Sequence, residues 1–194
     1  MRSLRQFLLL SAALILILPA CKKNDDSTST SLKVRIIDNK GNSLPGVTVK
    51  LYTALEDLEQ EEKQVSTTLT TDTTGEVVFS GLSMLKYYWY AEKGCMNNMN
   101  GILTTDKLEA GEEKTITSTL IETGTLELNN QSAGTYLVYV NGSLLLTADP
   151  MYSCSYKYVP AGAYNIIVSL VGGSTSKTFN SSISCGGTLT INYP

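Results

Sequence analysis

The stretch that decides the fold runs Leu32-Lys-Val-Arg-Ile36, Asp38-Asn-Lys-Gly-Asn-Ser-Leu-Pro-Gly46 and Val47-Thr-Val-Lys-Leu51. Apolar and polar residues alternate in its first and last parts, and a period of two is typical of a strand with one buried face. The middle part is rich in Asp, Asn, Gly and Pro, which end strands and form turns. The stretch therefore predicts two β-strands joined by a turn.

The same alternation of apolar and polar residues continues to residue 122. A turn-forming Asp72-Thr-Thr-Gly75 lies between two alternating runs, as in a hairpin. The further strands are expected at 67–71, 76–79, 86–92 and 114–121. Six or seven strands over residues 32–122 predict a β-sandwich.

These residues also carry a resemblance. The segments Gly41–Tyr52, Thr71–Phe79 and Tyr87–Ala91 resemble the carboxypeptidase regulatory-like, prealbumin-type sandwich. The resemblance implies a fold more than an activity, because most members of that family are noncatalytic modules of surface and secreted proteins.

The run Tyr87-Tyr-Trp-Tyr-Ala91 contains the candidate binding aromatics. A strand sends alternate side chains to opposite faces, and the family pattern directs Tyr87, Trp89 and Ala91 inward. Tyr88 and Tyr90 are then expected to face outward, either as ligand-facing aromatics or as cross-strand packing.

A second block of strands follows Gly124. Asn141-Gly142 between two alternating runs is a strong hairpin signal. Strands are expected at 125–129, 135–140, 143–147, 154–159, 164–170, 177–184 and 188–193. The spacing of turns loosely resembles small PEGA-like envelope sandwiches. We therefore predict an all-β protein with two tandem small β-sandwich (Ig-like or prealbumin-like) domains, 32–122 and 123–194.

The first twenty residues predict a signal peptide. Arg2 and Arg5 precede an apolar run from Phe7 to Leu18, which as a helix would measure roughly 18 Å and fall short of the roughly 30 Å needed to span a bilayer. Leu18-Pro-Ala-Cys21 resembles the lipobox of bacterial lipoproteins. We expect cleavage after residue 20 and acylation of Cys21, which would hold the chain on a membrane.

Residues 21–31 are expected to form a lipidated flexible tether, because residues 22–31 are polar throughout. The residues after Cys21 resemble the export signal that sends Bacteroidetes lipoproteins to the cell surface. The expected location is the outer membrane, facing the cell surface, with a periplasm-facing position as the alternative.

Composition excludes several functions. Without Arg2 and Arg5, thirteen basic residues remain against eighteen acidic ones, a net charge of −5, and no basic block suits nucleic acid. No histidine is present, which removes Ser-His and Cys-His pairs and HExxH zinc sites. No Gly-rich phosphate loop precedes a helix, so no nucleotide and no other cofactor is expected.

The acidic run from Glu56 to Glu62 is the remaining candidate for chemistry. A carboxylate pair can hydrolyse glycosides, and carboxylates can bind calcium, but catalysis needs a pair that converges across a cleft. A run between two strands is instead typical of a solvated loop or short helical turn. No catalytic residue and no metal ligand is predicted.

Three cysteines remain beside Cys21, so at most one internal disulfide can form. Cys154 with Cys185 is the predicted pair, since both lie in the second block, and Cys95 is the alternative partner. The sequence as a whole predicts a noncatalytic envelope lipoprotein that binds a glycan or an outer-membrane protein. A fimbria-like structural subunit and a carboxylate-dependent glycan hydrolase are the alternatives.

Overall fold

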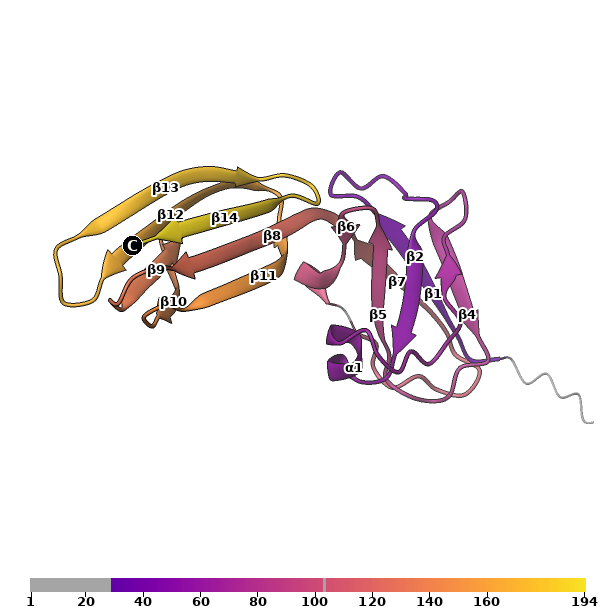
Figure 1. Cartoon of the computed structure of the whole chain (residues 1–194). Helices are drawn as coiled ribbons and strands as arrows, with labels where there is room; N and C mark the ends of the chain where they lie inside the picture. The colour runs from indigo at the N-terminus through magenta and orange to yellow at the C-terminus, as the bar shows by residue number, and fades with distance from the viewer. Residues whose placement is uncertain (1–28, 103) are drawn as a thin grey trace, which may run out of the picture.

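The computed structural model describes residues 29–102 and 104–194, and strands dominate it (Figure 1). The described helices are short: α1 (Leu55–Glu59) and the 3-10 turn η1 (Met99–Gly101). Two β-sandwiches follow each other along the chain, so the predicted all-β tandem architecture is confirmed. No described helix is both long and apolar enough to cross a bilayer. The predicted signal peptide and Cys21 lie outside the described residues.

The first sandwich packs two sheets face to face. One is a three-stranded sheet in the order β4 (Glu76–Ser80), β1 (Ser31–Ile37), β7 (Glu113–Thr119), with β1 and β7 parallel. The other contains β3 (Leu69–Thr70), β2 (Thr48–Tyr52), β5 (Tyr88–Lys93) and β6 (Met96–Asn97) in that order.

The core of this sandwich follows from the alternation in the sequence. Leu32, Val34 and Ile36 of β1 are fully buried against Trp89, which is 1% exposed. The inward positions predicted for Tyr87, Trp89 and Ala91 are confirmed. Burial of such side chains contributes about 1.5 to 3 kcal/mol each, which holds the sheets together.

The second sandwich is built in the same way. Its first sheet has the order β10 (Ser143–Ala148), β9 (Tyr136–Val140), β12 (Gly162–Leu170), β13 (Ser176–Ile183). The facing strands are β11 (Ser153–Pro160), β8 (Ile121–Asn130) and β14 (Thr188–Tyr193), with β14 parallel to β8. Between them lie Leu128, Val138, Ile166 and other apolar side chains of a separate core.

Strand β8 belongs to both sandwiches. Its first residues, Ile121 and Glu122, pair with β6 of the first sandwich, and the rest of it pairs with β11 and β14 of the second. The predicted boundary between residues 122 and 123 therefore falls inside this strand. Hydrogen bonding passes from one sandwich to the next through a single seven-stranded sheet, without a linker.

The molecule is elongated, with the two sandwiches end to end (Figure 1). Strand β1 ends beside the junction, where Leu120 donates to the carbonyl of Ile37. Its first residues lie at the far end of the first sandwich, bonded to the loops around residues 81 and 112. The chain thus enters at one end of the body, and β8 carries it away from that end.

Candidate functional site

The two candidate binding aromatics occupy different environments. Tyr90 is 3% exposed and packs with Tyr52 and Leu58, so of the two roles expected for it, ligand contact or packing, the structure shows packing. Tyr88 is half-buried against the same cluster, and Lys86 Nζ lies 5.1 Å from the centre of its ring. The outer face of β5 is covered because α1 and the residues around η1 fold over it.

The predicted disulfide between Cys154 and Cys185 is also wrong, because Cys185 is paired with Cys95. Cys154 lies within β11, opposite Leu128 of β8, and packs against the second core. Cys95 lies in the turn between β5 and β6, and Cys185 lies between β13 and β14. Both loops reach the junction, where the two Cα atoms are 5.5 Å apart.

Residues distant in sequence converge at the junction. Thr123 donates from its backbone N–H to the carbonyl of Cys95 at 3.0 Å, and its own carbonyl accepts from Gly186 at 2.8 Å. The Thr123 hydroxyl accepts from Asn97 Nδ2 at 2.7 Å. One residue of β8 therefore binds both loops that carry the disulfide.

Gly124 lets these loops approach. A Cβ at this position would lie 2.8 Å from the carbonyl oxygen of Ser184 and 2.5 Å from Ile183 Cγ2, and it would also collide with Gly187. Carbon atoms cannot approach neighbours so closely, so only glycine permits the loop before β14 to cross β8 here.

A second tie is made by Tyr158 of β11. The register of β11 against β8 shifts between Tyr156 and Val159, and Tyr158 has a φ of 59°, which is uncommon for an aromatic residue. Its hydroxyl donates to Glu61 Oε1 at 3.1 Å, and its carbonyl accepts from Asn100. The bulge thus brings Tyr158 of the second sandwich into contact with two loops of the first, at Glu61 and at Asn100.

Glu61 is part of a charged network beside the disulfide. Lys50 Nζ lies 3.1 Å from Glu61 Oε2 and 3.9 Å from Glu92 Oε1, and Tyr90 donates to Glu92 Oε2 at 3.0 Å. The rings of Tyr90 and Tyr158 have their centres 6.3 Å apart. The carboxylates of Glu61 and Glu92 therefore both pair with the ammonium group of Lys50, and each also accepts a hydrogen bond from a tyrosine hydroxyl.

The electrostatics of this network follow from burial and charge. Burial raises the pKa of Tyr90, and its hydrogen bond to Glu92 raises it further. Burial alone would lower the pKa of Lys50, but the hydrogen bond to Glu61 and the charges of Glu61 and Glu92 raise it above its ordinary value. At neutral pH the ammonium is charged and both phenols are protonated.

A hollow of about 520 Å³ lies over this network. Its walls include Glu92, Glu127, Lys157 and Tyr158, and the Cys95 loop forms part of its floor. Glu61 and Glu92 are already bonded to Lys50 and to the phenols. The charged groups beneath this hollow therefore pair with each other and help to join the two sandwiches.

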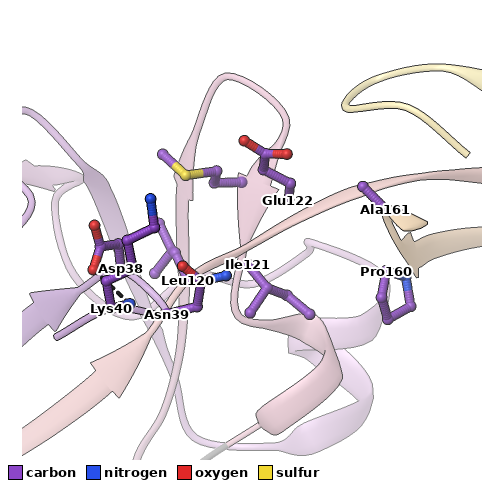
Figure 2. A pocket seen from close by; sticks show the side chains of 9 residues that line it. Asp38, Asn39, Lys40, Leu120, Ile121, Glu122, Pro160 and Ala161 are labelled. Carbon is purple, nitrogen blue, oxygen red and sulfur yellow. Dashed lines mark hydrogen bonds between the residues drawn. The ribbon is translucent and has the colours of Figure 1, made fainter. Parts of the chain in front are cut away.

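A second hollow, of about 430 Å³, also lies at the junction and is shown in Figure 2. The turn Asp38–Lys40 lies on one side and Pro160 and Ala161 on the other, with Leu120, Ile121 and Glu122 between them. The carboxylate of Asp38 accepts from the backbone of Lys40 and of Asn42, both at 2.8 Å. It stabilises its own turn.

The acidic run lies on α1 and on the loop that follows it. Leu55–Glu59 forms α1, in agreement with the predicted short helical turn, and Asp57 accepts from Lys63 at 3.0 Å. Glu61, at the end of this run, accepts a hydrogen bond from Tyr158 of the second sandwich. Within residues 29–102 and 104–194, no cluster of three or more Cys, Asp or Glu side chains is arranged to hold a metal ion.

The junction could not be found from the sequence. The count of three cysteines indicated one disulfide, but which loops meet depends on how β8 is shared between two sheets. The contact of Tyr158 with the first sandwich was not predictable, because a bulge and a positive φ leave no mark in an otherwise regular alternation.

Comparison with protein families identifies the fold of the first sandwich. Residues 30–99 match the family profile described as the SpaA prealbumin-like fold domain. The matched segment covers much of the first sandwich, and the predicted prealbumin-like fold is confirmed there. No curated protein sequence matches the chain.

Several solved structures with a similar arrangement are pilins. A streptococcal ancillary pilin is 16% identical, with a TM-score of 0.41 over 87% of this chain and 63% of its own. A minor pilin of Streptococcus agalactiae is 16% identical, with a TM-score of 0.39 over 85% of this chain and 94% of its own. The shaft pilin SpaA of Lactobacillus rhamnosus GG is 10% identical, with a TM-score of 0.37 over 85% of this chain and 96% of its own. The chain therefore spans less than two thirds of the streptococcal ancillary pilin.

Proposed function

We propose that this protein is a noncatalytic envelope module, anchored to a membrane through lipid on Cys21. Its two sandwiches form one rigid body that holds an interaction surface away from the membrane. The observation that carries the proposal is the junction, where β8 is common to both sandwiches and the Cys95–Cys185 disulfide closes them together. A body without a flexible linker keeps its far end at a constant distance from its tether.

The polarity of the chain supports this arrangement. The first described residues lie at the end of the first sandwich that is remote from the junction. The loops after β8, β10 and β12 lie at the opposite end of the molecule (Figure 1). Met151, which is 72% exposed, and Val171, which is 50% exposed, lie in two of these loops. Exposed apolar side chains at loop tips are typical of contact surfaces.

A glycan or another outer-membrane protein is the class of partner that we propose for this surface. The proposal rests on the outer-membrane location expected from the sequence and on the noncatalytic character of the family that the first sandwich resembles. We propose that the protein lies on the outer side of the outer membrane, and a position facing the periplasm is the alternative.

The anchor is tested by fractionation of cells that express the native chain, Cys21→Ala or Cys154→Ala. We expect the native chain and the Cys154→Ala control in the membrane fraction and the Cys21→Ala variant in the soluble fraction. If Cys21→Ala stays in the membrane fraction, the lipid anchor is wrong. Protease added to intact cells then separates the two faces, because a surface-facing chain is digested and a periplasm-facing chain is protected until lysis.

A structural, fimbria-like subunit is a second candidate, and one observation favours it. Strand β10 lies at the edge of its sheet, and its sequence Ser143-Leu-Leu-Leu-Thr-Ala148 contains no charged residue and no proline. Natural edge strands are usually protected by such residues, and an unprotected edge can pair with a strand of another chain. Subunits that assemble in this way would form oligomers whose size grows with concentration.

A further inference from the structure

The four-stranded sheet of the second sandwich has an outer face that no other part of the described chain covers. In the register of the sheet, Leu144 of β10 lies opposite Tyr139 of β9, which lies opposite Ile167 of β12, which lies opposite Thr178 of β13. The side chains of these four residues lie on the outer face of the sheet, because their sequence neighbours Val138, Ile166 and Phe179 pack into the core. Leu144, Tyr139 and Ile167 form an apolar row across three strands, and Thr178 ends this row on β13.

Polar residues of β12 and β13 flank this apolar row, and Leu137 of β9 lies opposite Ser169 on one side of it. On one side the Asn165 amide donates to Asn180 Oδ1 at 2.8 Å, and on the other side Ser169 lies opposite Ser176. The outward positions of the four strands hold only Leu, Ile, Ala, Tyr, Asn, Ser and Thr. The face therefore lacks Asp, Glu, Lys and Arg altogether, whereas the chain without its predicted signal peptide carries a net charge of −5.

We infer that this outer face, centred on the Leu144–Tyr139–Ile167 row, is the contact surface between two copies of this chain. Two acidic chains repel each other wherever charged surfaces meet, so an uncharged face is where two copies can approach without burying a charge. An apolar centre with a rim of amides and hydroxyls is the usual anatomy of a protein interface.

The arrangement of the rows is self-complementary. A two-fold axis along the apolar row places that row against the same row of the second copy. It also places Asn165 and Asn180 of one copy opposite Ser169 and Ser176 of the other, so donors meet acceptors on β12 and β13. Symmetric dimers form through such isologous patches, and sheets commonly pack face to face about 10 Å apart.

The size of the face predicts a weak dimer. The four strands are spaced by about 4.8 Å and have five to nine residues rising about 3.3 Å each, which gives a face of roughly 450 Å² per copy. The total of about 900 Å² is in the range of weak, transient interfaces, so dimerisation should depend on concentration. The inference goes beyond the proposed function and does not require the lipid anchor.

Analytical ultracentrifugation of the chain from residue 22 onward, which keeps both hydrophobic cores, tests the inference. We expect the average mass to rise towards twice the monomer mass as the concentration increases. Leu144→Glu buries a carboxylate in the contact and should raise the dissociation constant at least about tenfold. Leu85→Glu is the matched control, because Leu85 is 46% exposed in the first sandwich and Leu144 is 55% exposed. It should dimerise like the native chain.

A second variant separates the face from the edge of the sheet. Thr178→Glu lies in the same row but on β13, at the opposite side of the sheet from β10. Loss of dimerisation in both Leu144→Glu and Thr178→Glu supports the face. Loss in Leu144→Glu alone overturns the inference in favour of strand pairing along the β10 edge.

Other outcomes also overturn the inference. The inference is overturned if the native chain stays monomeric at every concentration. It is also overturned if a monomeric chain binds a neutral polysaccharide and loses that binding in Leu144→Glu, because the occupant of the face is then a glycan. Circular dichroism of each variant establishes that the sandwiches are folded, so that a loss of dimer is not caused by unfolding.

Discussion

Cys95 and Cys185 are separated by 90 positions in the sequence, yet their Cα atoms lie 5.5 Å apart and their side chains form a disulfide between the two sandwiches. Each residue lies in a loop that is also hydrogen-bonded to Thr123 of β8. The bond therefore closes a junction that backbone hydrogen bonds also cross.

Replacement of Cys95 by serine should lower the free energy of unfolding by about 2 to 5 kcal/mol, because the disulfide closes a long loop and restricts the unfolded chain. Fluorescence of Trp89, the single tryptophan, reports the first sandwich, and circular dichroism reports both. We expect the two signals to separate in urea unfolding of Cys95→Ser and to coincide in the native chain. Cys154→Ser is the control, since Cys154 is not in the disulfide, and equal effects of the two variants would contradict the assigned pairing.

Gly124→Ala should destabilise the second sandwich by about 2 to 4 kcal/mol, because the new methyl group would be forced against the backbone of the loop before β14. Thermal unfolding monitored by circular dichroism measures the change. Gly101→Ala is the matched control, since a Cβ there meets no atom within 4 Å. If Gly124→Ala unfolds at the same temperature as Gly101→Ala, the close crossing of β8 and this loop is not as described.

Tyr193→Phe should leave the stability at neutral pH unchanged or raise it by about 1 kcal/mol, because the buried hydroxyl of Tyr193 has no hydrogen-bond partner among the described residues. Tyr164→Phe is the contrast. Its hydroxyl donates to the carbonyl of Pro160 at 2.6 Å, so its removal should cost about 0.5 to 1.5 kcal/mol. Urea unfolding at neutral pH distinguishes the two variants, and a larger loss in Tyr193→Phe would refute the assignment.

The same tyrosine predicts a response to alkali. Burial raises the pKa of Tyr193 to about 12, above the ordinary value of 10.0. The folded state then holds the proton more tightly than the unfolded state, so stability is complete below pH 10 and falls as the pH rises towards 12. The loss amounts to roughly 2 to 3 kcal/mol at the upper end. In Tyr193→Phe this part of the pH dependence should vanish, and unfolding curves measured at alkaline pH would show it.

Asp72 should make the turn between β3 and β4, which lie in different sheets, sensitive to acid. The hydrogen bond from the Thr74 hydroxyl, together with those from the backbone N–H groups of Glu76 and Thr74, lowers the pKa of Asp72 below 3.8. The stabilisation is complete above pH 3.8 and is lost as the pH falls through the lower pKa of the folded state. Melting temperatures measured across the acid range should fall less steeply for Asp72→Asn than for the native chain.

Much of the fold could be predicted from local patterns. The alternation in Leu32–Ile36 places every second side chain on the buried face, and Asn141-Gly142 adopts the positive φ angles that a tight hairpin requires. The inward positions of Tyr87, Trp89 and Ala91 were correct for the same reason. Burial of Tyr90 was not predictable from its strand, because α1 and η1, which cover it, are separated from β5 in sequence.

The sequence by itself determined the strands, the two hydrophobic cores and the absence of histidine chemistry, because each depends on residue type and on spacing along the chain. Only the tertiary structure decided that β8 belongs to both sandwiches, that Cys185 pairs with Cys95, and that Leu144, Tyr139 and Ile167 form one row. These relationships join residues from different strands and loops. They depend on sheet order and register, which local alternation leaves open and which the packing of the whole chain selects.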